Sequence, residues 1–236
     1  MPRAAPTPPR PVVVSVGGSV LVTGDHDREY LEGLAAVLAR VGSGTPLLVT
    51  TGGGRTAREY IRLGRELGLT EVELDEVGIE VTRLHARLLA ARLGSPTPAH
   101  PPETVRAAVA ALAAGGPVIM GGTEPGHTTD GVAALLAVRL RAERVVNATD
   151  VDGVYDADPR THPNARRRPT ITWAEFRALV HVESPGGAGQ NFLFDRLGAD
   201  LLARAGIPLA VVAGRDLPSL EAALRGAPFH GTHVLP

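Results

Sequence analysis

The sequence predicts an α/β fold built around a mainly parallel sheet. Short apolar runs rich in Val, Ile and Leu alternate along the chain with longer segments in which apolar residues recur every three or four positions. The first pattern is typical of buried strands and the second of amphipathic helices, so their alternation indicates successive βα units. Three of the apolar runs lead into glycine turns, and such a fold binds ligands at the carboxyl ends of its strands.

The amino-terminal half is predicted to contain three strands and four helices. Residues 12–16, 46–50 and 117–120 are apolar runs of strand length. Helical spacing predicts helices over 28–41, 56–67, 74–93 and 103–113, with a proline-broken loop over 94–104. Gly68 is the expected stop signal of the second helix. The third helix carries an apolar stripe that we assign to the core rather than to a subunit interface: Leu84, Leu88, Leu89 and Leu93.

The carboxyl-terminal half continues the alternation. The predicted helices are 127–140, 173–180, 193–205 and 217–225, and the predicted strands are 144–149, 208–212 and 232–235. Residues 150–160 have the turn chemistry of an ordered loop. Residues 164–169 hold three consecutive arginines and are predicted to be a solvated surface run.

Composition excludes several classes of function. The 236 residues are 44% hydrophobic with a net charge of −1, so no general field favours nucleic acid or an anionic membrane. The absence of cysteine excludes thiol catalysis and zinc-thiolate sites, and it is typical of the cytoplasm. Residues 1–10 are proline-rich, lack the apolar stretch of a signal peptide, and are expected to be a disordered tail. No apolar run approaches the roughly 20 residues of a membrane span.

Glycine turns follow three predicted strands, at Gly17–Gly18, Gly52–Gly54 and Gly121–Gly122. Carboxyl ends of parallel strands lie at one edge of a sheet, and glycine lets backbone amides approach a phosphate without an intervening Cβ. A single glycine turn of this kind often only ends a strand, whereas three such turns at the same edge of the sheet favour an anion site. Neither the P-loop pattern nor the dinucleotide-binding pattern fits them.

Arginine is the only strong cation available to such a site. The chain contains 24 Lys+Arg and no lysine, so all 24 are arginine. Arg55 and Arg58 follow the triple glycine, three residues apart on one face near the positive end of a predicted helix. Helix dipole, free amides and two guanidiniums together favour an anion. The alternative is that both arginines are solvated surface charges.

Five motifs occur in a fixed order: VVVSVGGSVL, GGGRTAREYI, ELDEVGIEVTRLHARLL, VIMGGTEPGHTTDGVAALLA and NATDVDGVYDADPR. With the closing GTHVLP, they resemble the amino acid kinase superfamily, and within it the archaeal type of UMP kinase. The resemblance implies a three-layer αβα sandwich that transfers the ATP γ-phosphoryl group to UMP. It implies a single domain over 11–236, with an acceptor lobe (11–140) and an ATP lobe (141–236). It further implies ATP and Mg²⁺ as cofactors, a cytoplasmic location, and a homohexamer assembled as a trimer of dimers.

The resemblance also assigns roles to residues within the motifs. Gly53, Gly54 and Arg58 would hold the UMP phosphate, Asp75 would bind the ribose, and the loop 121–130 would reach the base. The other acceptor-binding residues that it implies are Thr123, His127, Thr128 and Thr129. The implied ATP-binding residues are Ser15, Thr149, Asp150, Asp152, Gly153, Tyr155 and Asp158. Around the transferred group it implies Gly17, Gly18, Arg55, Asp130 and Asp195.

Several of these residues have a purely structural alternative. Asp75 could cap a helix, Thr128 and Thr129 could begin one, and Asp152–Gly153 could be an ordinary turn. For His127 an orienting role is favoured over a general base, because a phosphate acceptor is already nucleophilic. No histidine or carboxylate spacing predicts a resident metal site.

Three departures from the family pattern concern the transfer site. Ser15 stands where many members of the superfamily have a lysine, and Arg55 follows the triple glycine where the archaeal type has a lysine or similar cation. Asp150 adds negative charge beside the expected ATP phosphates, and Gln190, Asn191 and Phe192 are atypical neighbours of Asp195. These departures leave two other functions open: a kinase acting on another phosphate or carboxylate, and a nucleotide-binding storage or regulatory protein.

Overall fold

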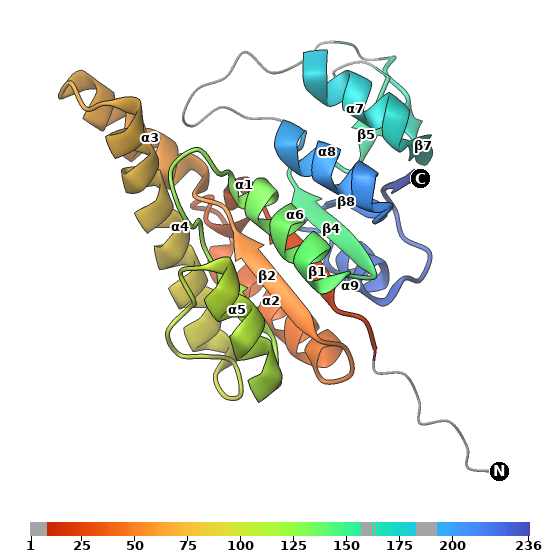
Figure 1. Cartoon of the computed structure of the whole chain (residues 1–236), viewed down its shortest axis with the longest axis horizontal. Coiled ribbons are helices and arrows are strands. Elements are labelled where there is room, and N and C mark those ends of the chain that lie inside the picture. The colour runs from red at the N-terminus through yellow and green to blue at the C-terminus, as the bar shows by residue number, and fades with distance from the viewer. Residues whose placement is uncertain (1–8, 157–161, 163, 183–192) are drawn as a thin grey trace.

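The computed structural model of the chain describes residues 9–156, 162, 164–182 and 193–236. Seven strands form one sheet in the order β3-β2-β1-β4-β8-β9-β7 (Figure 1). Their bounds are β1 Val12–Val16, β2 Leu47–Thr51, β3 Val118–Met120, β4 Arg144–Thr149, β7 Thr170–Thr172, β8 Leu209–Ala213 and β9 Thr232–Leu235. Neighbouring strands run parallel except β8 and β9, which confirms the mainly parallel sheet.

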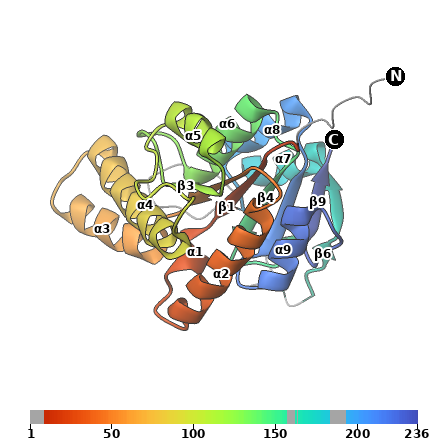
Figure 2. The ribbon, with the colours of Figure 1, turned by 90° about the horizontal axis from the view of Figure 1, so that it is seen from below.

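Helices cover both faces of this sheet and make a three-layer αβα sandwich (Figure 2). One face packs against α2 Asp27–Gly42, α4 Glu71–Leu93 and α9 Leu217–Arg225. The other packs against α5 Val105–Ala111, α6 Thr129–Leu140, α7 Trp173–Val182 and α8 Arg196–Ala205. Helix α3, Gly54–Glu66, lies outside α4 and packs on it through a small apolar cluster that includes Ile61 and Leu74.

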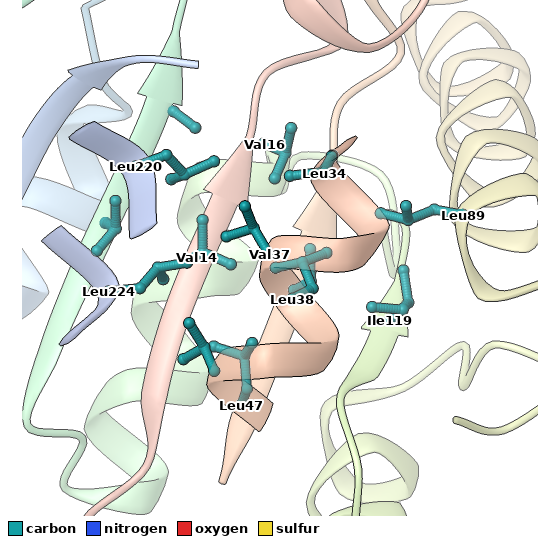
Figure 3. Close-up of a cluster of buried hydrophobic side chains, with 14 of the residues drawn as sticks. Val14, Val16, Leu34, Val37, Leu38, Leu47, Leu89, Ile119, Leu220 and Leu224 are labelled. Carbon is teal, nitrogen blue, oxygen red and sulfur yellow. The ribbon is translucent and has the colours of Figure 1, made fainter. Parts of the chain in front are cut away.

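The core explains why the central strands are apolar along their whole length. In β1, Val12, Val14 and Val16 belong to the cluster under α2, whereas Val13 belongs to the cluster on the opposite face. A parallel sheet buried on both faces has no polar side, so alternation disappears from its strands. Figure 3 shows the first cluster, in which β1 meets apolar side chains of α2 and α9.

The order of the strands determines where a ligand can enter. The chain runs outward from β1 to β2 and β3, then returns to place β4 on the other side of β1. The direction of winding therefore reverses between β1 and β4, and such a reversal leaves a crevice outside the carboxyl ends of the strands. The ladder aligns Ser15 of β1 with Thr50 on one side and Asn147 on the other, which forms a short polar row near that edge.

The structure corrects the prediction for the three arginines in part. Residues 164–169 lie at the surface and Arg166 is exposed, but the run is not irregular, because β6 Arg167–Arg168 pairs antiparallel with β5 Val154–Tyr155. Strand β5 lies inside the segment predicted to be a loop. The Arg167 side chain is 23% exposed and donates a hydrogen bond to the backbone carbonyl of Gly231. A two-residue strand has no periodicity to detect, so tertiary pairing decides it.

The apolar stripe of the long helix was also assigned incorrectly in part. Leu89 is buried, but Leu84 is 61% exposed and Leu88 is 49% exposed, so neither belongs to the core of this chain. Two further elements were not predicted: strand β7 and the one-turn helix α1, Gly18–Leu21. The helix predicted over 193–205 begins at Arg196, and that over 103–113 ends in a 3₁₀ turn, Leu112–Ala114.

Some sequence predictions lie outside the described residues. They are those for Asp158, Gln190, Asn191 and Phe192 and for the tail over 1–8. Within the described part of the chain, no helix is both long and apolar enough to cross a membrane.

Candidate active site

A cavity of about 570 Å³ opens at the carboxyl ends of the central strands. The glycine turns after β1, β2 and β3 contribute Gly17, Gly18, Gly52, Gly53, Gly54 and Gly122 to its walls. The end of β4 contributes Thr149 and Asp150, and α4 contributes Asp75, Ile79 and Thr82. The three turns predicted to converge therefore do so in a single cavity, because their strands are parallel neighbours.

The turns after β1 and β2 pack backbone against backbone. A Cβ at Gly18 would lie 2.6 Å from the carbonyl carbon of Gly52 and closer still to the backbone nitrogen of Gly54. A Cβ at Gly52 would lie 2.5 Å from the Gly18 nitrogen. Gly54 also has a φ of +60°, a conformation that favours glycine. Only glycine fits these positions, and the contact brings two sets of backbone amides to one point.

The two arginines at the start of α3 occupy different places. Arg58 lines the cavity, and no other arginine does so among the residues that the structure describes. The Arg55 side chain is 64% exposed, lies 3.5 Å from the Glu59 carboxylate, and does not line the cavity. Its guanidinium is adjacent to Gly24, at the outer side of the turn after α1.

Asp75 faces the cavity from the second turn of α4 and is not a helix cap. The helix begins four residues earlier, with Thr70 capping it in a capping box completed by Glu73. The Asp75 carboxylate accepts a hydrogen bond from the Gly126 N–H at 2.8 Å. This bond ties the loop between β3 and α6 to α4 across the mouth of the cavity. The helix-cap alternative for Asp75 is therefore removed.

The loop between β3 and α6 supplies three more of the predicted residues. His127, Thr128 and Thr129 line the cavity. Thr128 also caps α6, since its hydroxyl accepts a hydrogen bond from the Gly131 N–H at 3.0 Å. His127 Nδ1 lies 3.3 Å from Glu124 Oε1 but makes no hydrogen bond of normal geometry in the described part of the chain.

Thr123 lies elsewhere. It lines a groove on the outer side of α4 together with Glu76 and Glu80, and its carbonyl accepts a hydrogen bond from Arg83. The structure therefore does not bring Thr123 to the cavity with the other predicted residues.

Asp130 sits at the floor of the cavity, in the first turn of α6. Its carboxylate accepts a hydrogen bond from the Ser15 hydroxyl at 2.5 Å. Burial raises the pKa of Asp130 to about 6 against the lowering effect of the Ser15 hydrogen bond, and the negative charge of Asp195 makes a smaller raising contribution. Asp195 lines the same cavity and caps α8 by accepting the Gly198 N–H at 2.6 Å.

Of the predicted ATP-binding residues that the structure describes, Ser15 is fully buried and does not line the cavity, and the others fall into two groups. Thr149 and Asp150 line the cavity and are hydrogen-bonded to each other at 3.2 Å. Asp152, Gly153 and Tyr155 lie outside it, at the β5–β6 hairpin. There the Tyr155 hydroxyl donates to Asp152 at 2.6 Å, and that hydrogen bond raises the pKa of Tyr155.

Sequence reasoning missed Thr82, His85 and Asn147. Thr82 accepts the Gly122 N–H at 2.6 Å, and His85 Nδ1 lies 2.8 Å from the Gly52 carbonyl oxygen. Asn147 lines the cavity and donates to the Leu193 carbonyl at 3.0 Å. Thr82 and His85 lie on the buried stripe of α4 that also includes Leu89. Polar residues on an apolar helical stripe were a signal that could have found them.

Comparison with known proteins identifies the family of the chain. The model of the amino acid kinase family matches residues 10–213. The uridylate kinase of Methanothermobacter thermautotrophicus is 41% identical over 226 residues, which cover 95% of this chain and 99% of that protein. The uridylate kinase of Thermoplasma volcanium is 43% identical over 228 residues, which cover 94% of this chain and 96% of that protein.

Solved structures give the same result. The crystal structure of uridylate kinase from Archaeoglobus fulgidus superposes with a TM-score of 0.84 at 36% identity, covering 94% of this chain and 99% of that one. The UMP kinase of Bacillus anthracis, at 23% identity and a TM-score of 0.78, shares the fold. Because the family match spans most of the sequence and close relatives align along nearly all of it, the chain belongs to the amino acid kinase family.

Proposed function

We propose that the protein is a UMP kinase, which transfers the γ-phosphoryl group of ATP to the phosphate of UMP and yields UDP and ADP. The observation that carries this proposal is the convergence of three glycine turns, Arg58 and Asp75 on one cavity. That cavity belongs to a chain 41–43% identical to uridylate kinases along nearly its whole length.

The proposed substrates divide the domain into two lobes. UMP binds to the acceptor lobe, residues 11–140, with its phosphate on the Gly53 and Gly54 amides and Arg58 and its ribose on Asp75. ATP binds to the lobe of residues 141–236, with its phosphates near Thr149 and Asp150. Support for this division comes from the cavity, which both groups of residues line.

Transfer requires little covalent chemistry from the protein. An oxygen of the UMP phosphate attacks the γ-phosphorus of ATP in line, and the bond from that phosphorus to the bridging oxygen breaks as ADP leaves. Catalysis of such a step is mainly positioning and charge stabilisation. The Gly18 N–H supplies a donor at the crossing of the two turns, whereas the Gly17 N–H already donates to the Ala148 carbonyl oxygen at 2.8 Å. Arg58 supplies the positive charge inside the cavity, whereas the Arg55 side chain is exposed, lies outside the cavity and pairs with Glu59.

The residues present also fit Mg²⁺ carried by ATP. Mg²⁺ prefers oxygen ligands and is usually held by one or two carboxylates together with substrate phosphates. Asp150, Asp130 and Asp195 present such oxygens to the cavity. Within the residues described, no group of three or more His, Cys, Asp and Glu side chains could hold a metal ion by itself. When bound, Mg²⁺ would neutralise phosphate charge.

The proposal extends to a homo-oligomer in the cytoplasm. Tyr60 and Leu63 on α3, Leu67 directly after it, and Leu84 and Leu88 on α4 are large apolar side chains that are 47–72% exposed. Helices α3 and α4 lie side by side in both ribbon views (Figures 1 and 2), and each exposes apolar surface to a second copy. This surface supports the dimer step of the expected hexamer, and the absence of cysteine agrees with a reducing compartment. Light scattering after gel filtration tests the assembly.

The test of function is an ADP-release assay with ATP, Mg²⁺ and UMP, CMP, AMP or GMP as acceptor. We expect turnover with UMP. Arg58→Ala should lower kcat/KM for UMP at least a hundredfold, because a charge-assisted contact to phosphate is lost. Arg62→Ala is the matched control, since Arg62 lies one turn further along α3, is exposed, and pairs with Glu66.

Arg55→Ala in the same assay decides between the two arginines. A loss of kcat/KM confined to Arg58→Ala would assign the positive charge on the transferred phosphate to Arg58 alone. A comparable loss in Arg55→Ala would assign that charge to both arginines. Tight ATP binding without transfer to any nucleotide would overturn the proposal and favour a storage or regulatory protein.

A further inference from the structure

The turn after β2 is hydrogen-bonded to a buried histidine that has no role in the proposed reaction. His85 lies on α4 and is 6% exposed. Its Nδ1 is 2.8 Å from the carbonyl oxygen of Gly52. A carbonyl oxygen can only accept a hydrogen bond, so Nδ1 carries the proton and donates it. The hydrogen bond to this turn therefore fixes the tautomer of His85, with the proton on Nδ1.

The hydrogen bond fixes the orientation of a whole peptide unit. The Gly52–Gly53 peptide is trans, and in a trans peptide the C=O and N–H groups point in opposite directions. With the Gly52 carbonyl directed at His85, the Gly53 N–H points away from it. In the described part of the chain the Gly53 N–H has no hydrogen-bond acceptor. It is therefore available to a ligand in the cavity that Gly53 lines.

Two glycines make this restraint necessary. Gly52 and Gly53 lack a Cβ, so no side chain of their own restricts the peptide between them. The N–H of Gly52 bonds to the Val16 carbonyl at 2.9 Å and belongs to the preceding peptide, which leaves the Gly52 carbonyl to be fixed from elsewhere. His85 is the side chain that fixes it.

The support for His85 is itself rigid. Leu89, one turn further along α4, is buried in the core and is directed toward it in Figure 3. Thr82, nearly one turn earlier, accepts the Gly122 N–H at 2.6 Å, and its carbonyl accepts the Thr51 hydroxyl at 2.9 Å. The same stretch of α4 thus holds two of the three glycine turns through Thr82 and His85.

We propose that His85 is a positioning residue of the acceptor site: it holds the Gly52–Gly53 peptide so that the Gly53 N–H faces the phosphate of the nucleoside monophosphate. This inference rests on the proposed function, because it takes UMP as the acceptor. It predicts that UMP binding depends on the hydrogen-bond donor at Nδ1 and not on the remainder of the imidazole. Asparagine is the informative substitution, since its Nδ2 stands the same number of bonds from Cβ as His85 Nδ1 and can donate to the same carbonyl.

The experiment compares His85→Asn, His85→Leu and the wild type by calorimetric titration with UMP in the absence of ATP, and by steady-state kinetics. We expect His85→Leu to weaken UMP binding about tenfold and to raise KM for UMP similarly, with KM for ATP changed less than twofold. His85→Asn should bind UMP within threefold of the wild type. His100→Leu, at an exposed histidine in the loop before α5, is the control and should leave both values unchanged.

Each outcome distinguishes the inference from the proposed function. Failure of the wild type to bind UMP would overturn the proposed function, and the inference with it. Binding of UMP by the wild type and equally by His85→Leu would overturn the inference alone. Equal weakening in His85→Asn and His85→Leu would also overturn it, since the role would then be packing rather than orientation. Melting temperatures of all variants, measured by circular dichroism, identify any loss that comes from unfolding. If His85→Leu does not fold, weakened UMP binding by a folded His85→Asn still overturns the inference.

Discussion

Asp130 at the floor of the cavity should make the stability of the protein depend on pH. The pKa of its carboxyl is raised from the usual 3.8 to about 6, because burial disfavours the charged form. The folded protein therefore keeps this proton up to about pH 6, whereas the unfolded chain releases it near pH 3.8. Between these values the folded state binds more protons, so the free energy of unfolding falls as the pH rises.

The magnitude follows from the difference between the two pKa values. A difference of about two pKa units, at 1.36 kcal/mol each, corresponds to about 3 kcal/mol of stability lost between pH 4 and pH 7. This figure is an upper bound, because Asp130 lines an open cavity in which water can solvate its carboxylate. The substitution Asp130→Asn removes the titrating proton and keeps an acceptor for the Ser15 hydroxyl.

The assay is urea unfolding at several pH values, followed by the fluorescence of Trp173, the single tryptophan. The stability of Asp130→Asn relative to the wild type should increase by up to about 3 kcal/mol from pH 4 to pH 7 and then stay constant. Asp200→Asn is the control. Arg177 and His181 lower the pKa of Asp200 against its partial burial, so its contribution is lost only below pH 4. A relative stability of Asp130→Asn that does not change across this pH range would refute the reasoning.

Two further predictions concern a glycine of the cavity wall and a helix cap. Gly18→Ala should destabilise the fold by about 2 kcal/mol or more and abolish activity, because its Cβ would overlap the backbone of Gly54, which cannot move aside. Gly44→Ala, where a Cβ would meet nothing within 4 Å, should leave the urea midpoint nearly unchanged, and equal effects at the two glycines would contradict the packing argument. Thr70→Ala should cost about 1 kcal/mol through loss of the cap of α4 while kcat stays the same, which thermal unfolding and the ADP-release assay can check together.

Local chemistry was sufficient to predict most of the elements. The run of valines in β1 can be buried only in a strand covered on both faces, and the glycine turns after β1, β2 and β3 mark the ends of parallel strands. Gly68, with a φ of +82°, ends α3 as expected from the residue alone. The order of the motifs identified the family, because five separate patterns in one sequence carry far more information than any single turn.

Only the tertiary structure decided which side chains meet at those turns. Ser15 and Asp130 are 115 residues apart in sequence, yet they share a hydrogen bond because β1 lies beneath α6. Similarly, His85 meets the Gly52 carbonyl only because α4 crosses under the turn after β2. The exposure of Leu84 also depends on packing, because α4 carries apolar residues on more than one side and its sequence does not say which side faces the core. The two-residue strand β6 likewise exists only because it pairs with β5. Sequence periodicity records which residues are buried along an element, whereas a site is made by contacts between elements, and these depend on packing.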